Sequence, residues 1–443
     1  MKFAPPLRAA ALLTAVALLP ATTAGLAQVD GRASPEFAKL FAVYQRIKSS
    51  YVEPVDDDVL VRGAIDGMLA SLDPHSEYLD GAELERLETM IDGNYQGLGI
   101  SVQMDDGAVK VVSPFKGSPA DKAGLKSGDY ITHIDGHLIY GLKLDDAVKQ
   151  MRGPAGSSVK LSVFRPGRDQ PFDVTVKRGT IELEPVTYEM HDGGIGVISV
   201  NEFSRDVGVD VNRAVTALRA KSNGRLSGLV LDLRKNPGGS LDEAVALSDL
   251  FLSSGEIVSQ RGRSRGDSVY YPAEKFYRGD VAKDVPMIVL IDEGTASASE
   301  IVAGALQDQH RALIMGERSF GKGSVQTLLP LTRDSALKLT TARYYTPSGR
   351  SVQEGGIEPD IRVPQLSDED ASKRRLNYRE SDLRGHLVNE AKLDDKDLEA
   401  DKRDDPRFML TAAELEKQGI KDFQLDYAIK TLRRTGRALV AAR

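Results

Sequence analysis

The feature that most constrains the fold is a series of four short apolar runs in the second half of this 443-residue chain. Each run is nearly continuous in apolar residues, which is typical of strands buried on both faces of a parallel sheet. Helical spacing of apolar residues marks the stretches between them. The runs are 194–200, 228–233, 286–291 and 311–315, and the helical stretches are 209–218, 241–252 and 297–309. This alternation predicts an α/β fold.

The rest of the chain predicts further domains. Residues 28–90 form a helical N-terminal segment, 91–178 a β-rich domain with one helix at 144–151, 179–365 the α/β core, and 366–443 a charged tail. The apolar face of the first helical pattern consists of Phe37, Leu40, Phe41, Tyr44 and Ile47. In the tail, Thr411 and Glu414 form a capping box, and a last amphipathic helix follows.

The first 27 residues have the composition of a secretory signal peptide. Lys2 and Arg8 precede an apolar stretch at 9–19, and the small-residue cleavage site is either 22–24 or 25–27. The alternative is an uncleaved membrane anchor, but the apolar stretch is shorter than the ~20 residues that span a bilayer. We therefore expect cleavage, export and a periplasmic location.

Composition excludes several classes of function. The formal net charge of −7 disfavours a nucleic-acid-binding surface, because phosphates require clustered Lys and Arg. The absence of cysteine leaves no disulfide and no lipid-modified cysteine. Of the six histidines only His133 and His137 are close, and Asp135-Gly136 between them predicts a turn joining two strands. We expect no metal and no cofactor.

Ser297 and Lys322 are the candidate catalytic pair. Ser297 begins the predicted helix in Ser-Ala-Ser-Glu, where the pattern is also that of a capping box, and the positive end of a helix favours developing negative charge. A serine needs a neutral base, and a lysine is one only if burial lowers its pKa from about 10.4. Gly316 to Lys322 resembles the start of a phosphate-binding loop, but Gly323 replaces its Ser or Thr and a strand follows.

The segments around Ser297 and Lys322 resemble those of the carboxyl-terminal processing peptidases, also called tail-specific proteases, over roughly residues 51–363. This resemblance implies a crotonase-like α/β core with an inserted PDZ domain. It assigns Ser297 as the nucleophile, Lys322 as the general base and Gln326 as the residue that orients the lysine. On a strand, Lys322 and Gln326 would share a face.

The loop 233–239 ends a predicted strand and opens a helix, and its glycines expose backbone N–H groups. A plain strand-to-helix turn would have the same residues. The resemblance assigns the oxyanion hole to Ala298 together with Gly238 or Gly239, and the choice between the two glycines stays open.

The run Gln96, Gly97, Leu98, Gly99 and Ile100 resembles the carboxylate-binding loop of a PDZ domain. Such loops bind the terminal carboxylate of a peptide, which adds as a strand beside the next edge. Leu144, Val148 and Met151 could wall the pocket or belong to the core.

The resemblance implies an exported serine endopeptidase that binds its substrates by their C-termini. Arg152 is the candidate for a regulatory contact with Gln326. Some family members act with a lipoprotein adaptor, so such a partner is possible here. The helical segments at both ends could also mediate self-association, or they could pack against the protease core. The alternatives are a non-catalytic PDZ carrier or chaperone, and a hydrolase that uses His310, which lies about 20 Å along the same predicted helix from Ser297.

Overall fold

The computed structural model describes residues 34–105, 107–168, 170–277, 279–367, 379–391 and 408–441. The expected signal peptide at 1–27 lies outside these ranges, as do most of the charged runs of the tail. The chain divides into two compact units, residues 1–67 and 68–443, and we describe each by itself. In the described part of the chain, no helix combines the length and apolar composition that crossing a bilayer requires.

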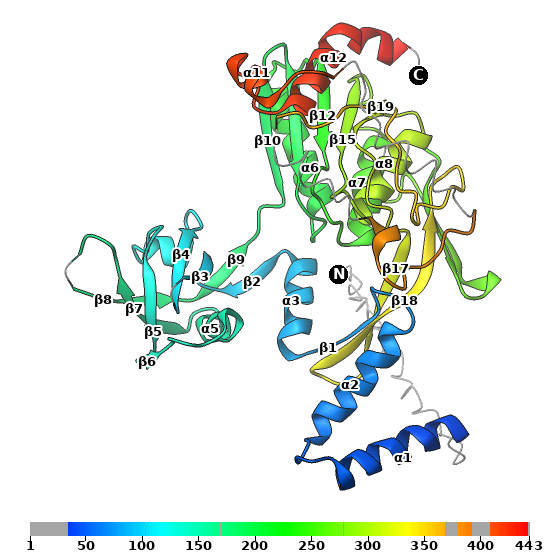
Figure 1. Cartoon of the computed structure of the whole chain (residues 1–443). Helices are drawn as coiled ribbons and strands as arrows, with labels where there is room; N and C mark the ends of the chain where they lie inside the picture. Colours follow the sequence, from blue (N-terminus) through cyan, green and yellow to red (C-terminus); the bar gives the residue numbers. More distant parts are fainter. Residues whose placement is uncertain are drawn as a thin grey trace, which may run out of the picture. The chain divides into compact units, whose positions relative to one another are not determined.

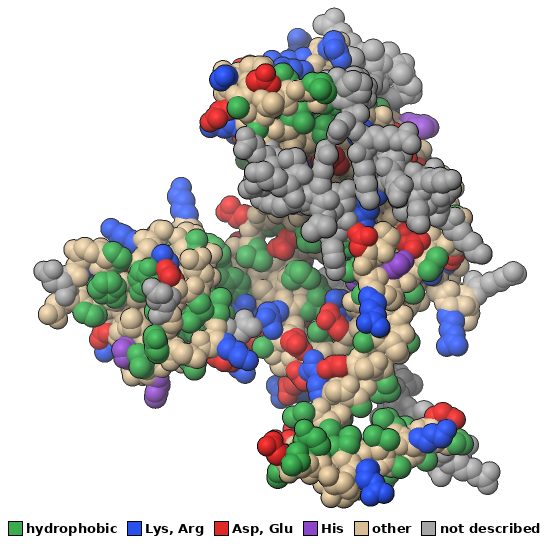
Figure 2. Space-filling view, viewed as in Figure 1, with side chains coloured by type: hydrophobic (Ala, Val, Ile, Leu, Met, Phe, Trp, Pro, Cys, Tyr) green, Lys and Arg blue, Asp and Glu red, His purple; other side chains and the backbone are tan. Residues whose placement is uncertain are grey.

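In the first unit, the predicted apolar helix face is not buried. Helix α1 (Pro35–Ser50) is capped by Ser34, and the side chains of Phe37 and Phe41 are 61% and 57% exposed. Lys48 pairs with Asp57 at the start of α2 (Asp57–Ala70). Figure 2 shows the apolar side chains of these helices on the surface at the bottom of the view.

The second unit contains the predicted α/β core (Figure 1). Its sheet has the order β10 (Val186–His191), β11 (Ile195–Val200), β12 (Gly228–Asp232), β15 (Met287–Ile291), β16 (Leu313–Gly316) and β19 (Ile361–Arg362). All neighbours from β11 to β19 are parallel, and β10 is antiparallel to β11. The four predicted strands and their parallel arrangement are confirmed.

Helices cover both faces of this sheet. Leu229 and Leu231 pack in one core with α6 (Val207–Lys221), α7 (Leu241–Phe251) and α8 (Ala298–Asp308). Val230 faces the opposite core, which contains residues of α11 (Ala412–Lys417) and α12 (Phe423–Ala441). Burial of successive residues on opposite faces explains why the strands are continuous apolar runs. The C-terminal helices are confirmed, and Thr411 caps α11 as expected.

A second sheet of the core was not predicted, except for one strand. Its order is β1 (Glu77–Asp80), β18 (Ser335–Tyr345), β13 (Glu256–Gly262) and β14 (Ser268–Pro272), and the predicted strand β17 (Ser324–Pro330) also pairs with β18. Helix α3 (Gly81–Asp92) follows β1 and ends at Gly93, which has a φ of 68°.

The β-rich domain has its own buried core. Its sheet has the order β3 (Ile100–Asp105), β4 (Ala108–Pro114), β5 (Tyr130–Ile134), β7 (Ser158–Phe164) and β8 (Phe172–Lys177), with β6 (His137–Leu138) paired to β5. Strand β3 is therefore an edge strand. Helices α4 (Pro119–Lys122) and α5 (Leu144–Met151) belong to this domain, and β2 (Asn94–Gly97) pairs with β9 (Gly179–Glu182) where the chain enters and leaves it. Asp135 and Gly136 form the predicted turn, both with positive φ.

Candidate active site

One pocket of the core brings together the residues predicted for the reaction. Its volume is about 310 Å³. Its lining includes Ser297, Lys322, Gln326, Gly238, Gly239 and Ala298. These residues come from three segments that are far apart in the sequence, and the fold places all three around one cavity.

Ser297 lies between strand β15 and helix α8. Its φ of 55° and ψ of −114° are unusual for a residue with a side chain, and such backbone strain costs about 1–3 kcal/mol and persists only where the surroundings impose it. The Ser297 N–H donates to the carboxylate of Glu300 at 2.7 Å, which is one half of the predicted capping box. The Glu300 N–H donates to the Ser297 carbonyl at 2.9 Å, and its capping-box contact with the serine side chain is also present.

The strained turn is held by the neighbouring loop after β12. Thr295 accepts a hydrogen bond from the Asp292 N–H and donates to the Leu233 carbonyl, both at 2.9 Å. The Ala296 N–H donates to the Asn236 carbonyl at 3.0 Å. The loop that carries Ser297 and the glycine loop 233–239 are therefore one hydrogen-bonded structure at the carboxyl ends of the adjacent parallel strands β12 and β15.

The two glycines of this loop are required by close backbone contacts. Gly238 has a φ of 103°, and a Cβ atom there would lie 2.8 Å from the Cβ of Ser297. A Cβ on Gly239, which has a φ of 142°, would lie 2.4 Å from the Phe203 carbonyl oxygen. The Gly238 N–H already donates to the Asn236 side chain at 2.9 Å. This bond makes the N–H of Gly238 different from that of Gly239, a difference that the sequence did not show.

Lys322 lies in the segment between β16 and β17. A strand follows it, as predicted, so the segment is not a phosphate-binding loop. Burial lowers the pKa of Lys322, and the ammonium of Lys338 lowers it further, while Glu380, Glu300 and Glu77 act in the opposite direction. The direction of this shift is the one that a lysine base needs.

The prediction that Lys322 and Gln326 share one face of a regular strand was wrong. Strand β17 begins only at Ser324, and its pairing with β18 shifts register between Val325 and Gln326. A bulge of this kind breaks the simple alternation of faces. The Gln326 amide donates to the hydroxyls of Ser324 at 3.0 Å and Thr340 at 3.1 Å. Both amide hydrogens are used, and the side-chain oxygen is left as the acceptor.

Two buried side chains at this site, Glu300 and Tyr344, were not predicted from the sequence as functional residues. Burial raises the pKa of Glu300 to about 7, although four donors to its carboxylate lower it. Burial also raises the pKa of Tyr344 well above its ordinary value. The Ser-x-x-Glu pattern was a signal for Glu300, but only as a helix cap. Tyr344 lies on β18, which the sequence did not predict.

The expected peptide-binding loop lies at the edge of the β-rich domain. Gln96 and Gly97 end β2, Gly99 has a φ of 71°, and Ile100 begins edge strand β3. The carbonyl of Leu98 accepts the Ala120 N–H, and that of Gly99 accepts the Phe115 N–H, both at 2.9 Å. The loop is therefore anchored to the domain by its carbonyls. On α5, Met151 belongs to the core, whereas Leu144 and Val148 are partly buried.

Arg152 follows α5. Its guanidinium lies over the ring of Tyr95, 5.1 Å from the centroid, and pairs with Glu85 of α3 at 3.5 Å. Arg152 does not line the pocket that contains Gln326.

His310, the alternative base, lies beyond the far end of α8 and does not line this pocket either.

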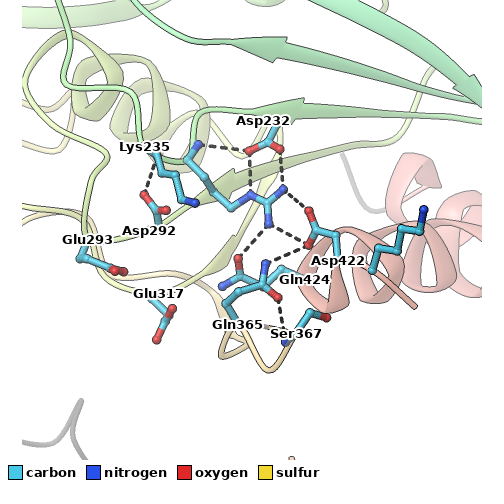
Figure 3. Close-up of a pocket in the computed structure, with 11 residues that line it drawn as sticks. Asp232, Lys235, Asp292, Glu293, Glu317, Gln365, Ser367, Asp422 and Gln424 are labelled. Carbon is cyan, nitrogen blue, oxygen red and sulfur yellow. Dashed lines mark hydrogen bonds and ion pairs between the residues drawn. The ribbon is translucent and has the colours of Figure 1, made fainter. Parts of the chain in front are cut away.

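A second pocket, of about 380 Å³, is lined mainly by charged side chains (Figure 3). Arg234 lines it and pairs with Asp232 at 2.6 Å and with Asp422 at 2.7 Å. These ion pairs connect the end of β12 to the start of α12. Burial raises the pKa of Asp292 at its wall. Within the described ranges, no three His, Cys, Asp or Glu side chains are grouped so that they could hold a metal ion.

Comparison with known families and proteins agrees with these features. Residues 194–363 match peptidase family S41, 96–176 match the PDZ domain, and 20–83 match the N-terminal domain of the activating protease CtpB. The β-rich domain is therefore a PDZ domain inserted before the protease core.

Three similar proteins illustrate the relationship. A carboxy-terminal-processing protease of Bartonella bacilliformis is 44% identical over 90% of this chain and 88% of its own length. The carboxy-terminal processing protease CtpA of Bacillus subtilis is 39% identical over 74% of this chain and 69% of its own. Among solved structures, a photosystem II D1 C-terminal processing protease is 31% identical, with a TM-score of 0.44, over 74% of this chain and 86% of that one. The chain thus belongs to peptidase family S41, as a serine-type carboxy-terminal processing protease with a PDZ domain.

Proposed function

We propose that this protease is an exported endopeptidase that binds polypeptide C-termini through its PDZ domain and cleaves them by a serine-lysine mechanism. The observation that carries the proposal is the single pocket around Ser297, Lys322 and Gln326, in which burial lowers the pKa of the lysine.

In this mechanism Lys322 removes the proton from the Ser297 hydroxyl as the oxygen attacks the peptide carbonyl. Burial lowers the pKa of Lys322 below its ordinary value, which is the direction that favours a neutral amine. Gln326 accepts a hydrogen bond from that amine through its side-chain oxygen. Its amide is fixed by Ser324 and Thr340, so it can direct the amine without adding a negative charge.

The oxyanion of the tetrahedral intermediate needs backbone donors close to Ser297. We assign this role to the N–H groups of Ala298 and Gly239. Ala298 is the first residue of α8, where N–H groups lack partners within the helix. Gly238 is the weaker candidate because its N–H is bonded to the Asn236 side chain.

Substrate binding is assigned to the loop Gln96–Ile100 and to edge strand β3. An edge strand can pair with an extended peptide, while N–H groups of the loop bind the terminal carboxylate. Leu144 and Val148 of α5 are only partly buried and would contact the last side chain of the peptide. The catalytic pocket also contains Leu87, Met90 and Ile91 of α3, which suit an apolar residue beside the cleaved bond.

Three further parts of the proposal concern regulation and context. Arg152 would act through α3, since its partner Glu85 is on the helix that also lines the catalytic pocket. The exposed apolar face of α1 supports self-association or binding of a lipoprotein adaptor. Cleavage of the chain after Ala27 and recovery from the periplasm would test export.

The central test uses purified protein and a peptide that ends in an apolar residue. Ser297→Ala and Lys322→Ala should abolish cleavage and keep peptide binding, and an amidated C-terminus should weaken binding to every form. His310→Ala should remain active. Labelling of Ser297 by a serine-directed phosphonate would distinguish the protease from a carrier. Cleavage by purified Ser297→Ala would refute the mechanism.

A further inference from the structure

We propose that Glu300 and Tyr344 are positioning residues that together fix the backbone of Ser297 relative to that of Lys322. This inference rests on the proposed serine-lysine chemistry. Neither side chain needs to touch the substrate for this role, and each acts through the two catalytic residues.

Glu300 binds both catalytic residues through one carboxylate. One oxygen accepts the N–H groups of Ser297 at 2.7 Å and of Lys322 at 3.0 Å. The other accepts the Ser319 hydroxyl at 2.5 Å and the Gly321 N–H at 2.7 Å. The side chain is completely buried, and each oxygen already has two donors. The start of α8 and the lysine segment are therefore held by the same group.

Tyr344 binds the same two residues on their carbonyl side. Its hydroxyl donates to the Lys322 carbonyl and lies 3.1 Å from the Ser297 carbonyl, so its one proton can be shared between them. It is also 3.5 Å from the Glu300 carboxylate. Tyr344 is 1% exposed and lies on β18, so the second sheet holds this hydroxyl in place.

Ser297 and Lys322 are thus held at both their N–H and their carbonyl groups. This matters for Lys322 because it lies between two glycines, and Gly321 has a φ of 95° that few other residues adopt. Such a segment has little rigidity of its own. Proton transfer requires heavy atoms about 2.6–3.2 Å apart, and a displacement of about 1 Å can cost on the order of 100-fold in rate.

Electrostatics alone would argue against a carboxylate at this position. Glu300 raises the pKa of Lys322 and so opposes the neutral form that a base needs. Its geometric role explains its presence despite this effect, because only a carboxylate can accept four donors from both catalytic segments at once.

The decisive experiment compares Tyr344→Phe with Tyr345→Phe in the full-length protein. Tyr345 is also buried, and its hydroxyl bonds to Glu390 instead of the catalytic segments. We expect Tyr344→Phe to lower kcat by about 10- to 100-fold with KM unchanged, and to slow phosphonate labelling of Ser297 in parallel. Tyr345→Phe should keep kcat within about two-fold of the parent.

A second comparison uses Glu300→Gln against Asp249→Asn. Asp249 is a buried carboxylate that accepts three N–H groups from residues 274–277. Glu300→Gln should lower kcat by at least as much as Tyr344→Phe, and Asp249→Asn should not lower it. If Glu300→Gln does not fold, the tyrosine pair decides alone. Equal kcat for Tyr344→Phe and Tyr345→Phe would overturn the inference while Ser297 and Lys322 remained essential, whereas cleavage by Ser297→Ala would instead refute the proposed mechanism.

Discussion

The buried carboxylate of Glu300 makes the stability of the protease core depend on pH in an unusual direction. In the unfolded chain its pKa is near the ordinary value of 4.5, and in the folded protein burial raises it to about 7. Between these values the folded protein binds a proton that the unfolded chain releases. The contribution to stability is therefore complete below pH 4.5 and is lost as the pH rises through about 7.

The size of the effect follows from the two pKa values. For one group with these values, the free energy of unfolding of the parent protein should rise by roughly 2–3 kcal/mol as the pH falls from 8 to 5. Glu300→Gln removes the titrating group and therefore this part of the pH dependence. It also lowers stability at every pH, because an amide cannot accept four donors, but that loss does not change with pH.

The measurement is urea unfolding of the parent and of Glu300→Gln at several pH values. The chain has no tryptophan, so far-UV circular dichroism is the appropriate signal. The PDZ domain has its own core, and its transition must be separated from that of the protease core. Val230→Ala removes two methyl groups from a fully buried side chain of β12 and should shift only the unfolding transition of the protease core, which identifies that transition.

The difference between the two unfolding free energies should grow toward pH 5. Other titrating groups are common to both proteins and largely cancel. A difference independent of pH would show that the four donors fully offset the effect of burial. That outcome would refute the reasoning, because a pKa of Glu300 at or below 4.5 in the folded protein leaves its contribution almost constant between pH 5 and pH 8.

Three other changes test different parts of the structure. Lys338→Gln removes an ammonium that lowers the pKa of Lys322, so the pKa of Lys322 should rise and the acid limb of the pH profile of kcat/KM should move to higher pH. An unchanged profile would contradict the assignment of Lys322 as the base. Arg234→Met removes a largely buried guanidinium from the partly exposed carboxylate of Asp422 and should cost about 1–3 kcal/mol in urea unfolding. No measurable loss would mean that α12 docks without this pair. Leu432→Ala trims a side chain that is 2% exposed beneath the sheet and should cost about 2–5 kcal/mol, with activity retained under conditions where the core stays folded.

The parallel sheet was predictable because its strands are buried on both sides. A strand such as β12 must be apolar at every position, and this requirement is visible in the sequence without any knowledge of its neighbours. The strands of the second sheet are partly exposed and mix charged with apolar residues. Arg261 of β13 and Lys338 of β18 interrupt any apolar pattern, so these strands left no comparable signal.

The exposed face of α1 shows the opposite limit. Its apolar residues have the spacing of a buried helix face, yet Phe37 and Phe41 are mostly exposed in the first unit. A pattern of apolar residues shows that a face can be buried, but it does not identify the surface that would bury it.

By itself, the sequence determined the α/β core and the β-rich domain, because helix and strand periodicity depends on residues close together in the chain. Its short motifs, by resemblance to a family, singled out Ser297, Lys322 and Gln326 as candidates. The tertiary structure alone decided that burial lowers the pKa of Lys322, that the Asn236 side chain accepts the Gly238 N–H, and that Glu300 and Tyr344 bind the segments of both Ser297 and Lys322. These features depend on burial and on hydrogen-bond partners from distant segments, and only the folded chain brings those segments together.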